Sequence, residues 1–242
     1  MRILSKSKTK ISNEMNNVPY HVGIIIDGNR RWARKRGLPA LEGHRQGLEK
    51  VKKVIKWCKA RGIKILTFYI FSTENWSRSK IEVYYLMKLL KRVLTKDIET
   101  INKEGFRVQI IGQKWKLSPQ LQKLIKKAEE LTKNNKEGIL NLAVSYGGRA
   151  EIVEAIKKII EKKIPSAEIT QDLVSQNFWT GNLPEPDLII RTGGEKRISN
   201  FLIWQAAYAE LYFCPKYWPD FTEKDLDEAL VNFASRQRRF GK

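Results

Sequence analysis

The segment His21-Val-Gly-Ile-Ile-Ile-Asp27 is a short apolar run that ends in a carboxylate, and Gly28 follows it. An apolar run without alternating polar residues is typical of a strand that is buried on both faces. Similar runs occupy residues 63–71, 106–111, 139–146, 186–191 and 210–213. Apolar residues at helical spacing lie in segments 45–61, 79–103, 149–163 and 222–236, with further helices predicted from Ser118-Pro119 onward and over 170–177. This alternation predicts a single α/β domain with a mostly parallel central sheet of about six strands, covered on both faces and flanked by helices.

The chain is strongly basic. Its 242 residues include 46 Lys and Arg against 26 Asp and Glu, which gives a net charge of +20, and the first 62 residues alone carry +12. Hydrophobic residues make up 42% of the chain, enough for a packed core, so a wholly disordered protein is excluded. The charge predicts a polyanionic partner: a nucleic acid, an anionic membrane surface or a phosphorylated substrate.

The start of the chain is polar. Residues 1–17 predict a flexible basic N-terminal tail, and residues 18–242 the folded domain. The tail lacks the apolar centre of a signal peptide, and the two cysteines have no metal-binding spacing, which favours a cytoplasmic protein. Because no apolar run approaches the ~20 residues of a membrane span, we expect at most a peripheral position at a membrane surface.

Polar residues follow four of the predicted strands, where ligands of parallel sheets bind. The segments are Asp27–Trp32, Ser72–Arg78, Tyr146–Arg149 and Arg191–Ser199. Their glycine turns, arginines, hydroxyls and carboxylates are typical of a site for diphosphate and a divalent metal. Each segment also has a structural interpretation. These are a surface helix with solvated arginines after Asp27, Trp76 covering the core, a common Gly-Gly turn after Tyr146, and Glu195 paired with an arginine.

Several common motifs are absent from the sequence. It has no Walker-type phosphate loop, no Gly-x-Gly-x-x-Gly and no Gly-x-Ser-x-Gly. Of its two histidines, His21 precedes a strand and is expected to be structural, whereas His44 begins a helix at the same end as Asp27. No Asp-Asp pair is present, which argues against the all-helical trans-prenyltransferases.

The sequence resembles the cis-prenyltransferase family, the isoprenyl transferases of the undecaprenyl diphosphate synthase type. The resemblance covers residues 20–242 and is carried by segments 21–33, 43–44, 71–78, 141–149, 187–205, 207–213 and 218–221. It implies a transferase that condenses isopentenyl diphosphate repeatedly onto an allylic diphosphate, farnesyl or geranylgeranyl, with Mg²⁺ as cofactor. The product would be a long-chain cis-polyprenyl diphosphate, the precursor of a glycosyl carrier lipid.

The resemblance also implies roles for individual residues. Asp27 would be catalytic and bind the metal together with Glu210, and Asn75 would assist proton removal. The allylic diphosphate loop would comprise Gly28, Asn29, Arg30, Arg31 and Trp32, with His44 near that diphosphate. Ser72, Thr73, Glu74, Trp76 and Arg78 would contact the substrates. Arg191, Arg197, Ile198 and Ser199 would clamp isopentenyl diphosphate.

Two further features follow from the resemblance. Ala40 stands where family members often carry Arg, so one allylic-phosphate contact is expected to be missing or to be supplied by Arg34 or Arg36. Arg31, the second arginine of Asn29-Arg-Arg-Trp32, is an alternative source of compensation. Arg239 and Gly241 match an ending that reaches the partner subunit's site, which implies a homodimer.

The growing chain needs an apolar tunnel. Candidate walls are 65–71 and 81–94, with Ile70 as a residue that narrows the tunnel, although plain core is the ordinary role of such residues.

Two alternative functions stay open at this point: a non-catalytic subunit of a heteromeric cis-prenyltransferase, and a basic nucleic-acid-binding protein. The first is disfavoured because the chain retains Asp27, Asn75, Arg191, Arg197 and Glu210. The absence of a nucleic-acid-binding motif argues against the second, so no nucleic-acid partner is expected.

Overall fold

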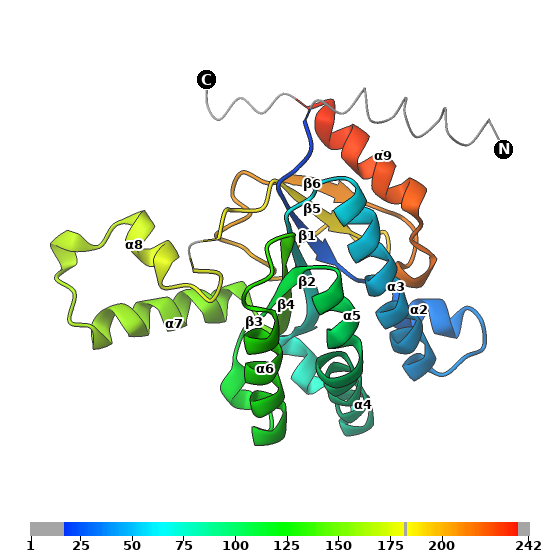
Figure 1. Ribbon diagram of the computed structural model, residues 1–242, viewed down its shortest axis with the longest axis horizontal. Helices are drawn as coiled ribbons and strands as arrows, with labels where there is room; N and C mark the ends of the chain where they lie inside the picture. The colour runs from blue at the N-terminus through cyan, green and yellow to red at the C-terminus, as the bar shows by residue number, and fades with distance from the viewer. Residues whose placement is uncertain (1–16, 182, 237–242) are drawn as a thin grey trace.

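Six strands form one sheet in the order β3-β4-β2-β1-β5-β6, and all neighbouring pairs are parallel (Figure 1). The computed structural model describes residues 17–181 and 183–236. The strands are β1 (His21–Ile25), β2 (Ile65–Ser72), β3 (Phe106–Ile111), β4 (Gly138–Tyr146), β5 (Leu188–Arg191) and β6 (Glu210–Phe213). The predicted parallel α/β sheet is thus confirmed. The first strand is shorter than predicted, because Ile26 and Asp27 already leave the sheet.

The helices largely follow the predicted segments. They are α2 (Asn29–Arg34), α3 (Ala40–Ala60), α4 (Lys80–Arg92), α5 (Ile98–Lys103), α6 (Pro119–Thr132), α7 (Gly148–Glu161), α8 (Gln171–Gln176) and α9 (Glu223–Ala234). Ser118 caps α6 as expected, because its side chain accepts a hydrogen bond from the backbone N–H of Leu121.

Two helix predictions were wrong in detail. The helix predicted over 45–61 begins at Ala40, directly after Pro39. The helix predicted over 79–103 is interrupted by a π-helical turn, Val93–Asp97, between α4 and α5. A π turn adds a residue without breaking the apolar pattern, so the spacing alone did not reveal it.

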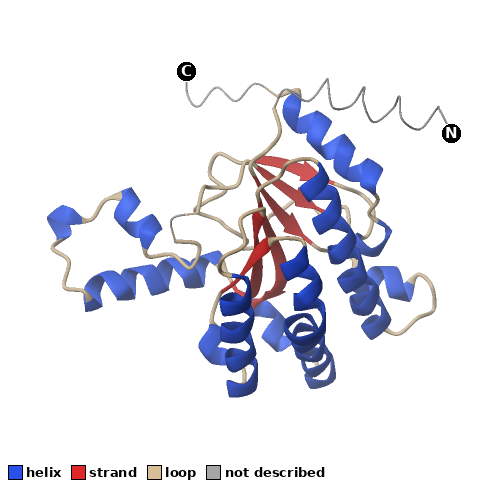
Figure 2. Ribbon diagram, in the orientation of Figure 1, coloured by secondary structure: helices blue, strands red, loops and turns tan. Residues whose placement is uncertain are grey.

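The two faces of the sheet are covered differently. Five helices, α3, α4, α5, α6 and α9, pack their apolar sides on one face and form the main core with strand residues such as Phe68 and Ile24. The other face carries a smaller core in which Phe201 and Leu202 pack on Ile25 and Tyr69. That cover is the irregular segment 198–209, so regular helices flank the first face while turns close the second (Figure 2).

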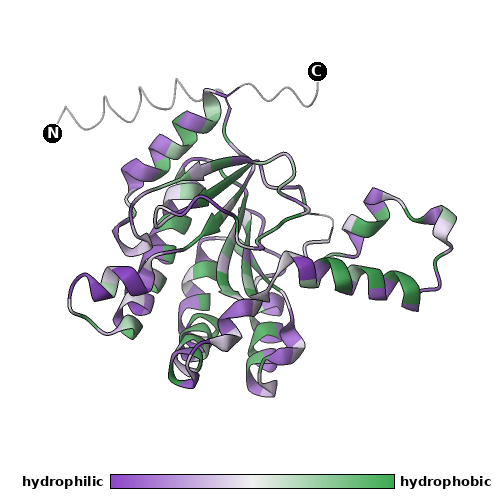
Figure 3. Cartoon of the chain, turned by 180° about the vertical axis from the view of Figure 1, so that it is seen from behind, coloured by the Kyte–Doolittle hydropathy of each residue, from purple (hydrophilic) through white to green (hydrophobic). Residues whose placement is uncertain are grey.

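Helix α7 projects from the body of the protein together with α8 (Figure 1). Its base is fixed by Glu151, which is 1% exposed. The Glu151 carboxylate accepts hydrogen bonds from the Tyr146 hydroxyl, the Gln205 amide and the backbone N–H of Trp179. Hydrophobic residues continue along α7 where it leaves the sheet (Figure 3). Among the described residues, no helix has both the length and the apolar character needed to cross a membrane.

A row of buried polar side chains crosses the second face near the amino ends of the strands. His21 Nδ1 donates to the carbonyl of Pro184 (2.7 Å), and His21 Nε2 accepts from the Thr67 hydroxyl (2.8 Å). The Asn141 amide donates to the same hydroxyl (3.0 Å). His21 is therefore structural, as expected: it links the 184 loop to β1 and β2.

We predict that, because of His21, the free energy of unfolding falls as the pH becomes mildly acidic. Burial lowers the pKa of His21 from 6.5 to about 4. Below about pH 6.5 the unfolded chain binds a proton at this residue that the folded chain does not, so the free energy of unfolding falls as the pH falls. The loss between about pH 6.5 and about pH 5 is about 1.5 kcal/mol. Urea unfolding of His21→Gln should show most of this slope removed.

Thr67→Val is the matched control for this measurement. It removes the hydroxyl that bonds to His21 but keeps the titrating group, so it lowers stability while leaving the pH slope. Equal slopes for the wild type and His21→Gln would contradict the prediction.

Candidate active site

One large cavity of about 1210 Å³ opens at the carboxyl ends of the central strands. Its polar part is lined by residues from the segments that follow β1, β2 and β5, but by none from segment 146–149 after β4. These residues are Asp27, Gly28, Asn29, Arg30, Arg31, Arg34, Ser72, Glu74, Asn75, Arg78, Arg191, Arg197 and Ser199. Its apolar part lies between α3, α4 and the sheet and includes Leu48, Val51, Leu86, Leu89, Leu140 and Leu142. The cavity therefore joins an arginine-rich edge to an apolar interior.

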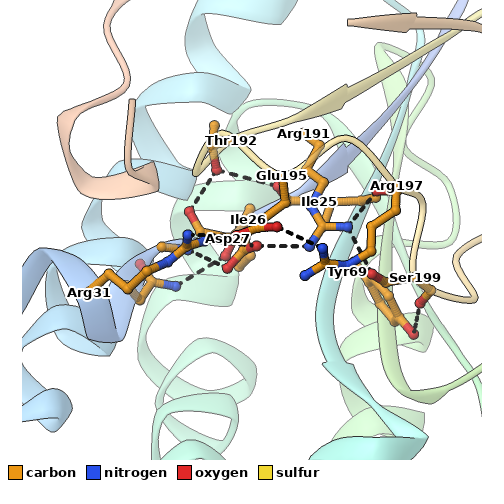
Figure 4. A network of polar contacts seen from close by, with 12 residues as sticks. Ile25, Ile26, Asp27, Arg31, Tyr69, Arg191, Thr192, Glu195, Arg197 and Ser199 are labelled. Carbon is orange, nitrogen blue, oxygen red and sulfur yellow. Dashed lines mark hydrogen bonds and ion pairs between the residues drawn. The ribbon is translucent and has the colours of Figure 1, made fainter. Parts of the chain in front are cut away.

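An ion pair between Asp27 and Arg191 lies at the centre of the polar edge (Figure 4). The Arg191 guanidinium donates to Asp27 Oδ2 at 2.8 Å, and Arg31 approaches the same oxygen at 3.2 Å. Asp27 Oδ1 accepts the backbone N–H of Gly28 at 2.6 Å. The β1–β5 register pairs Ile25 with Arg191, so the sheet itself places the two side chains together.

The charge of Asp27 is set by this arrangement. Partial burial opposes ionisation, but the Arg191 guanidinium and Arg31 outweigh it and hold the pKa of the carboxyl below its ordinary value. The Asp27 side chain remains 29% exposed toward the cavity. It is thus an ionised carboxylate that a ligand can reach.

The loop after β5 folds around Arg191. The Arg191 side chain is 5% exposed and donates to Ser199 Oγ (2.8 Å) and to the carbonyl of Arg197 (Figure 4). Glu195 bridges two arginines, at 3.0 Å from Arg31 and 2.6 Å from Arg197. The predicted gathering of Arg191, Arg197 and Ser199 is present, and so is the alternative pairing of Glu195 with arginine.

Glycines allow the first loop to pack tightly. Gly28 has φ 100°, a left-handed conformation, and a Cβ there would lie 2.7 Å from Tyr217. Helix α2 then lies directly on α3. A Cβ at Gly43 would lie 2.0 Å from the carbonyl oxygen of Asn29, and one at Gly47 would lie 2.5 Å from Asn29 Oδ1.

Glu82 of α4 is a residue of this edge that the sequence analysis missed. Its carboxylate, 9% exposed, accepts from Arg78 at 2.9 Å, lies 3.0 Å from His44 Nε2 and 3.8 Å from Arg30. Three side chains predicted to bind substrate are thus held by one buried acid. The signal was present in the sequence: Glu82 follows Ser79 at capping-box spacing and Arg78 at i+4.

Ionisation in this cluster is coupled. Burial lowers the pKa of His44, although Glu82 opposes the shift. Burial raises the pKa of Glu82, but His44, Arg78 and Arg30 more than compensate, and the carboxyl stays ionised. The cluster is a neutral imidazole and two guanidiniums around one carboxylate.

The turn after β2 is capped as well as polar. Ser72 and Asn75 form a capping box, in which Asn75 Oδ1 accepts the backbone N–H of Ser72 at 3.1 Å. Glu74 accepts from the Asn200 amide at 2.9 Å, which ties this turn to the loop that carries Ser199. Ser72, Glu74 and Asn75 all line the cavity.

Four of the predicted substrate contacts do not line the cavity: Trp32, Thr73, Trp76 and Ile198. The Trp32 indole donates to Asp220 (2.7 Å), outside the cavity. The Trp76 indole donates to Ser145 and packs on Phe71, which matches the alternative that it covers the core. Ile198 packs in the smaller core.

Glu210 is not brought beside Asp27. Glu210 opens β6, opposite Leu188 at the amino end of β5, whereas Asp27 follows the carboxyl end of β1. Glu210 instead pairs with Arg236. Strand direction separates the two expected metal ligands within the chain. Arg239 and Gly241 lie outside the described residues.

Ala40 and its predicted substitutes have distinct positions. Ala40 lines the cavity, and so does Arg34. Arg36 does not: it pairs with Asp220 at 3.1 Å and stacks on Trp32 at 4.4 Å. Of the two arginines, Arg34 is the one placed to serve this part of the cavity.

The predicted tunnel walls are only partly cavity-lining. From segment 81–94, the residues that face the cavity are Leu86, Leu89, Leu90 and Val93. Ile81 and Tyr84 instead face solvent, at 74% and 72% exposure. From β2, Tyr69 and Ile70 line the cavity, and Leu66 and Phe68 belong to the main core.

The donors at the edge fit a divalent cation that is carried in with a phosphate group. Mg²⁺ needs one or two carboxylates and takes its other oxygens from phosphates and water. Ionised Asp27 supplies one such carboxylate. No cluster of three His, Cys, Asp or Glu side chains that could hold a metal occurs among residues 17–181 and 183–236.

Comparison with known proteins gives consistent relatives. The family model described as "Putative undecaprenyl diphosphate synthase" matches residues 25–241. A Legionella pneumophila protein named ditrans,polycis-undecaprenyl-diphosphate synthase ((2E,6E)-farnesyl-diphosphate specific) is 48% identical over 228 residues, 93% of this chain and 96% of that protein. An isoprenyl transferase of Neisseria meningitidis is 45% identical over 237 residues, 98% of this chain and 95% of that protein.

Solved structures agree. Lavandulyl diphosphate synthase from Lavandula x intermedia, in complex with dimethylallyl diphosphate, matches with a TM-score of 0.89 and 40% identity, covering 93% of this chain and 99% of that one. A probable undecaprenyl diphosphate synthase from Campylobacter jejuni matches with a TM-score of 0.79 and 36% identity, covering 94% and 100%.

We predict that Glu82→Gln lowers the pKa of His44 further. The substitution keeps the shape of the side chain but removes the negative charge that opposes the effect of burial on His44. Titration of the His44 imidazole by NMR measures the shift. Glu74→Gln, which neutralises another carboxylate at the same edge, is the control and should leave His44 unchanged. An unaltered His44 titration in Glu82→Gln would show that the two side chains do not interact.

Proposed function

The chain belongs to the undecaprenyl diphosphate synthase family of prenyltransferases, and from that premise we propose that it is a cis-prenyltransferase. It condenses isopentenyl diphosphate repeatedly onto an allylic prenyl diphosphate, farnesyl or geranylgeranyl. Each cycle forms a carbon–carbon bond at the allylic carbon, releases the allylic diphosphate and removes a proton from the isopentenyl unit. The product is a long-chain cis-polyprenyl diphosphate, the precursor of a glycosyl carrier lipid.

The observation that carries the proposal is the joining of two environments in one cavity. An edge with six arginines suits two diphosphates, because charge-assisted hydrogen bonds offset the repulsion between them. The apolar interior between α3, α4 and the sheet suits a growing hydrocarbon chain and supports the expected tunnel.

The residues divide between two diphosphate positions. Arg30, Arg31 and the start of α2 bind the allylic diphosphate, with His44 behind them. Arg191, Arg197 and Ser199 bind isopentenyl diphosphate. Glu195, which neutralises Arg31 and Arg197 in the free protein, must give up these contacts as diphosphate oxygens take its place.

Asp27 lies between the two positions and would hold Mg²⁺ together with phosphate oxygens. The bound cation supplies positive charge that stabilises the departing diphosphate. Arg191 keeps the Asp27 carboxylate ionised and oriented for this purpose. Glu210 has no support as a second ligand within the same chain's cavity, because it lies at the other edge of the sheet.

Asn75 assists proton removal indirectly. Its carboxamide oxygen is engaged by the backbone of Ser72, which leaves the amide N–H groups to act. An amide N–H donates hydrogen bonds and does not accept a proton. Asn75 therefore orients the group that takes the proton from the isopentenyl unit.

The test is elongation of radiolabelled isopentenyl diphosphate from farnesyl diphosphate with Mg²⁺. We predict chain elongation by the wild type and a loss of roughly 100-fold or more in kcat for Asp27→Asn, which removes the charge at the centre of the edge. Asp227→Asn, which neutralises a carboxylate paired with Arg61 away from the cavity, should retain activity. Absence of elongation with every allylic primer would refute the proposed function.

Arg34 replaces the arginine that family members often carry at position 40. We predict that Arg34→Gln raises KM for the allylic diphosphate about 10-fold and leaves KM for isopentenyl diphosphate unchanged, because one charge-assisted contact is lost. Ala40→Arg in the same chain should restore KM. Arg36→Gln is the control, since Asp220 holds that residue outside the cavity. Equal effects of the two arginine substitutions would contradict the assignment.

We further propose a homodimer formed through α7. Val153, Ile156 and Ile160 are 50%, 48% and 68% exposed and share one side of the projecting helix. An exposed apolar stripe of this kind favours association. Arg239 and Gly241 would then complete the partner's site, as the resemblance implies.

The dimer is tested by light scattering coupled to size exclusion. Val153→Ser with Ile160→Ser should shift the protein toward monomer. Val231→Ser removes an apolar residue that is equally exposed, on α9, and should leave the mass unchanged. A monomeric wild type, or a dimeric double variant, would refute this interface.

The position of the enzyme in the cell belongs to the same proposal. Residues 1–16 of the predicted basic tail lie outside the described residues. The surplus charge of the first 62 residues supports a peripheral position of the enzyme at an anionic membrane, on the cytoplasmic side that the sequence predicts. A nucleic-acid partner is not part of the proposal, because the sequence contains no nucleic-acid-binding motif.

A further inference from the structure

Two exposed segments lie on elements that line the cavity, and both combine basic with apolar side chains. One is the loop after α2, with Lys35 and Leu38. The other is the outer side of α4, with Lys80, Ile81, Tyr84 and Lys88. We name these six residues the rim.

The rim lies on elements that border the same cavity. Leu38 itself lines the cavity, and so do Leu86 and Leu89 on the inner side of α4. Arg30 of α2 reaches Glu82 of α4 at 3.8 Å, which bridges the two segments. In Figure 1, α2 and α4 lie on the same side of the sheet.

Helix α4 is apolar on two sides. Its inner side faces the cavity, while Ile81 and Tyr84 on its outer side are 74% and 72% exposed, and Leu38 across the mouth is 40% exposed. A helix whose apolar residues extend around it is ordinarily covered on both sides. Large exposed residues gathered at a cavity mouth mark an interaction surface.

The charges of the rim are of one sign. The single acid of α4, Glu82, is buried and turned inward to His44 and Arg78. Within the described part of the chain, Lys35, Lys80 and Lys88 have no ion pair. The exposed stripe of α7 differs, since Glu154 and Lys157 pair beside it at 3.0 Å. Mixed charges suit a protein partner, whereas a purely basic rim suits an anionic one.

We propose that the rim docks on an anionic lipid bilayer, so that the mouth of the cavity faces the membrane. Ile81 and Leu38 enter the boundary of the acyl chains, Tyr84 lies at the level of the headgroups, and the lysines contact lipid phosphates. Resting on the proposed function, this docking gives a long polyprenyl product a path from the apolar interior into the bilayer without crossing water.

The test is binding of the full chain to vesicles, measured by co-sedimentation with phosphatidylcholine alone and with mixed phosphatidylcholine and phosphatidylglycerol. Wild type should bind the mixed vesicles, and salt should weaken this binding. Lys80→Gln with Lys88→Gln should reduce affinity about 30-fold. Ile81→Ser with Tyr84→Ser should reduce it roughly tenfold or more, with little salt dependence of the loss.

A charge-matched control separates the rim from the net charge of the protein. Lys126→Gln with Lys127→Gln removes two exposed lysines of α6 and should bind like the wild type. An equal loss in this control would overturn the proposal in favour of diffuse attraction. Wild-type binding by both rim variants, with loss on neutralising Lys6, Lys8 and Lys10, would place docking in the tail instead. A changed oligomeric mass in the rim variants would mean that the rim contacts a second copy.

Elongation from a soluble primer in detergent distinguishes this proposal from the proposed function. The rim variants should elongate isopentenyl diphosphate at the wild-type rate in detergent while failing to bind vesicles. A wild type that binds mixed vesicles but does not elongate would refute the function and leave the docking surface. A wild type that elongates but binds no vesicle would refute the docking surface alone.

Discussion

The ion pair between Asp27 and Arg191 is the interaction on which the rest of the polar edge depends. The parallel pairing of β1 with β5 sets the two residues side by side, and the 2.8 Å contact fixes the guanidinium. Arg191 then organises its own loop by donating to Ser199 and to the carbonyl of Arg197. A buried arginine without its carboxylate would leave an uncompensated charge, which is strongly unfavourable. One pair thus joins the two loops that the proposed reaction assigns to two different substrates.

A second buried acid gives the edge its other anchor. Glu82 holds His44, Arg30 and Arg78 from three different helices or turns, and it is itself placed by the cap of α4. The cavity edge is therefore rich in arginines, but neighbouring carboxylates partly neutralise their positive charges. Its arginines are oriented before any ligand arrives, and preorganised donors of this kind are the main source of electrostatic stabilisation in enzymes.

The sequence was informative about strands and strand ends and less so about side-chain direction. Apolar runs located all six strands, and parallel order alone brought Asp27, Ser72 and Arg191 to one edge. It could not tell which neighbours turn inward: Trp32 and Trp76 follow the right strands but bond to Asp220 and Ser145 outside the cavity. Glu210 was grouped with Asp27 through the family resemblance, and only the strand register shows that opposite edges separate them. Glu82 stood in a capping position that is common on any helix, so its burial and its three partners needed the fold.

The close packing of α2 on α3 has a consequence for how this edge can change. Gly43 leaves no room for even one methyl group against the backbone of Asn29, so a side chain at this position would push the first loop outward and move Asp27 away from Arg191. The space available on α3 therefore also limits the geometry of the Asp27–Arg191 ion pair at the strand ends. Substitutions at this contact would remove no ligand-binding group, but the lack of space excludes them. The sequence of the loops can therefore vary only at positions outside this contact.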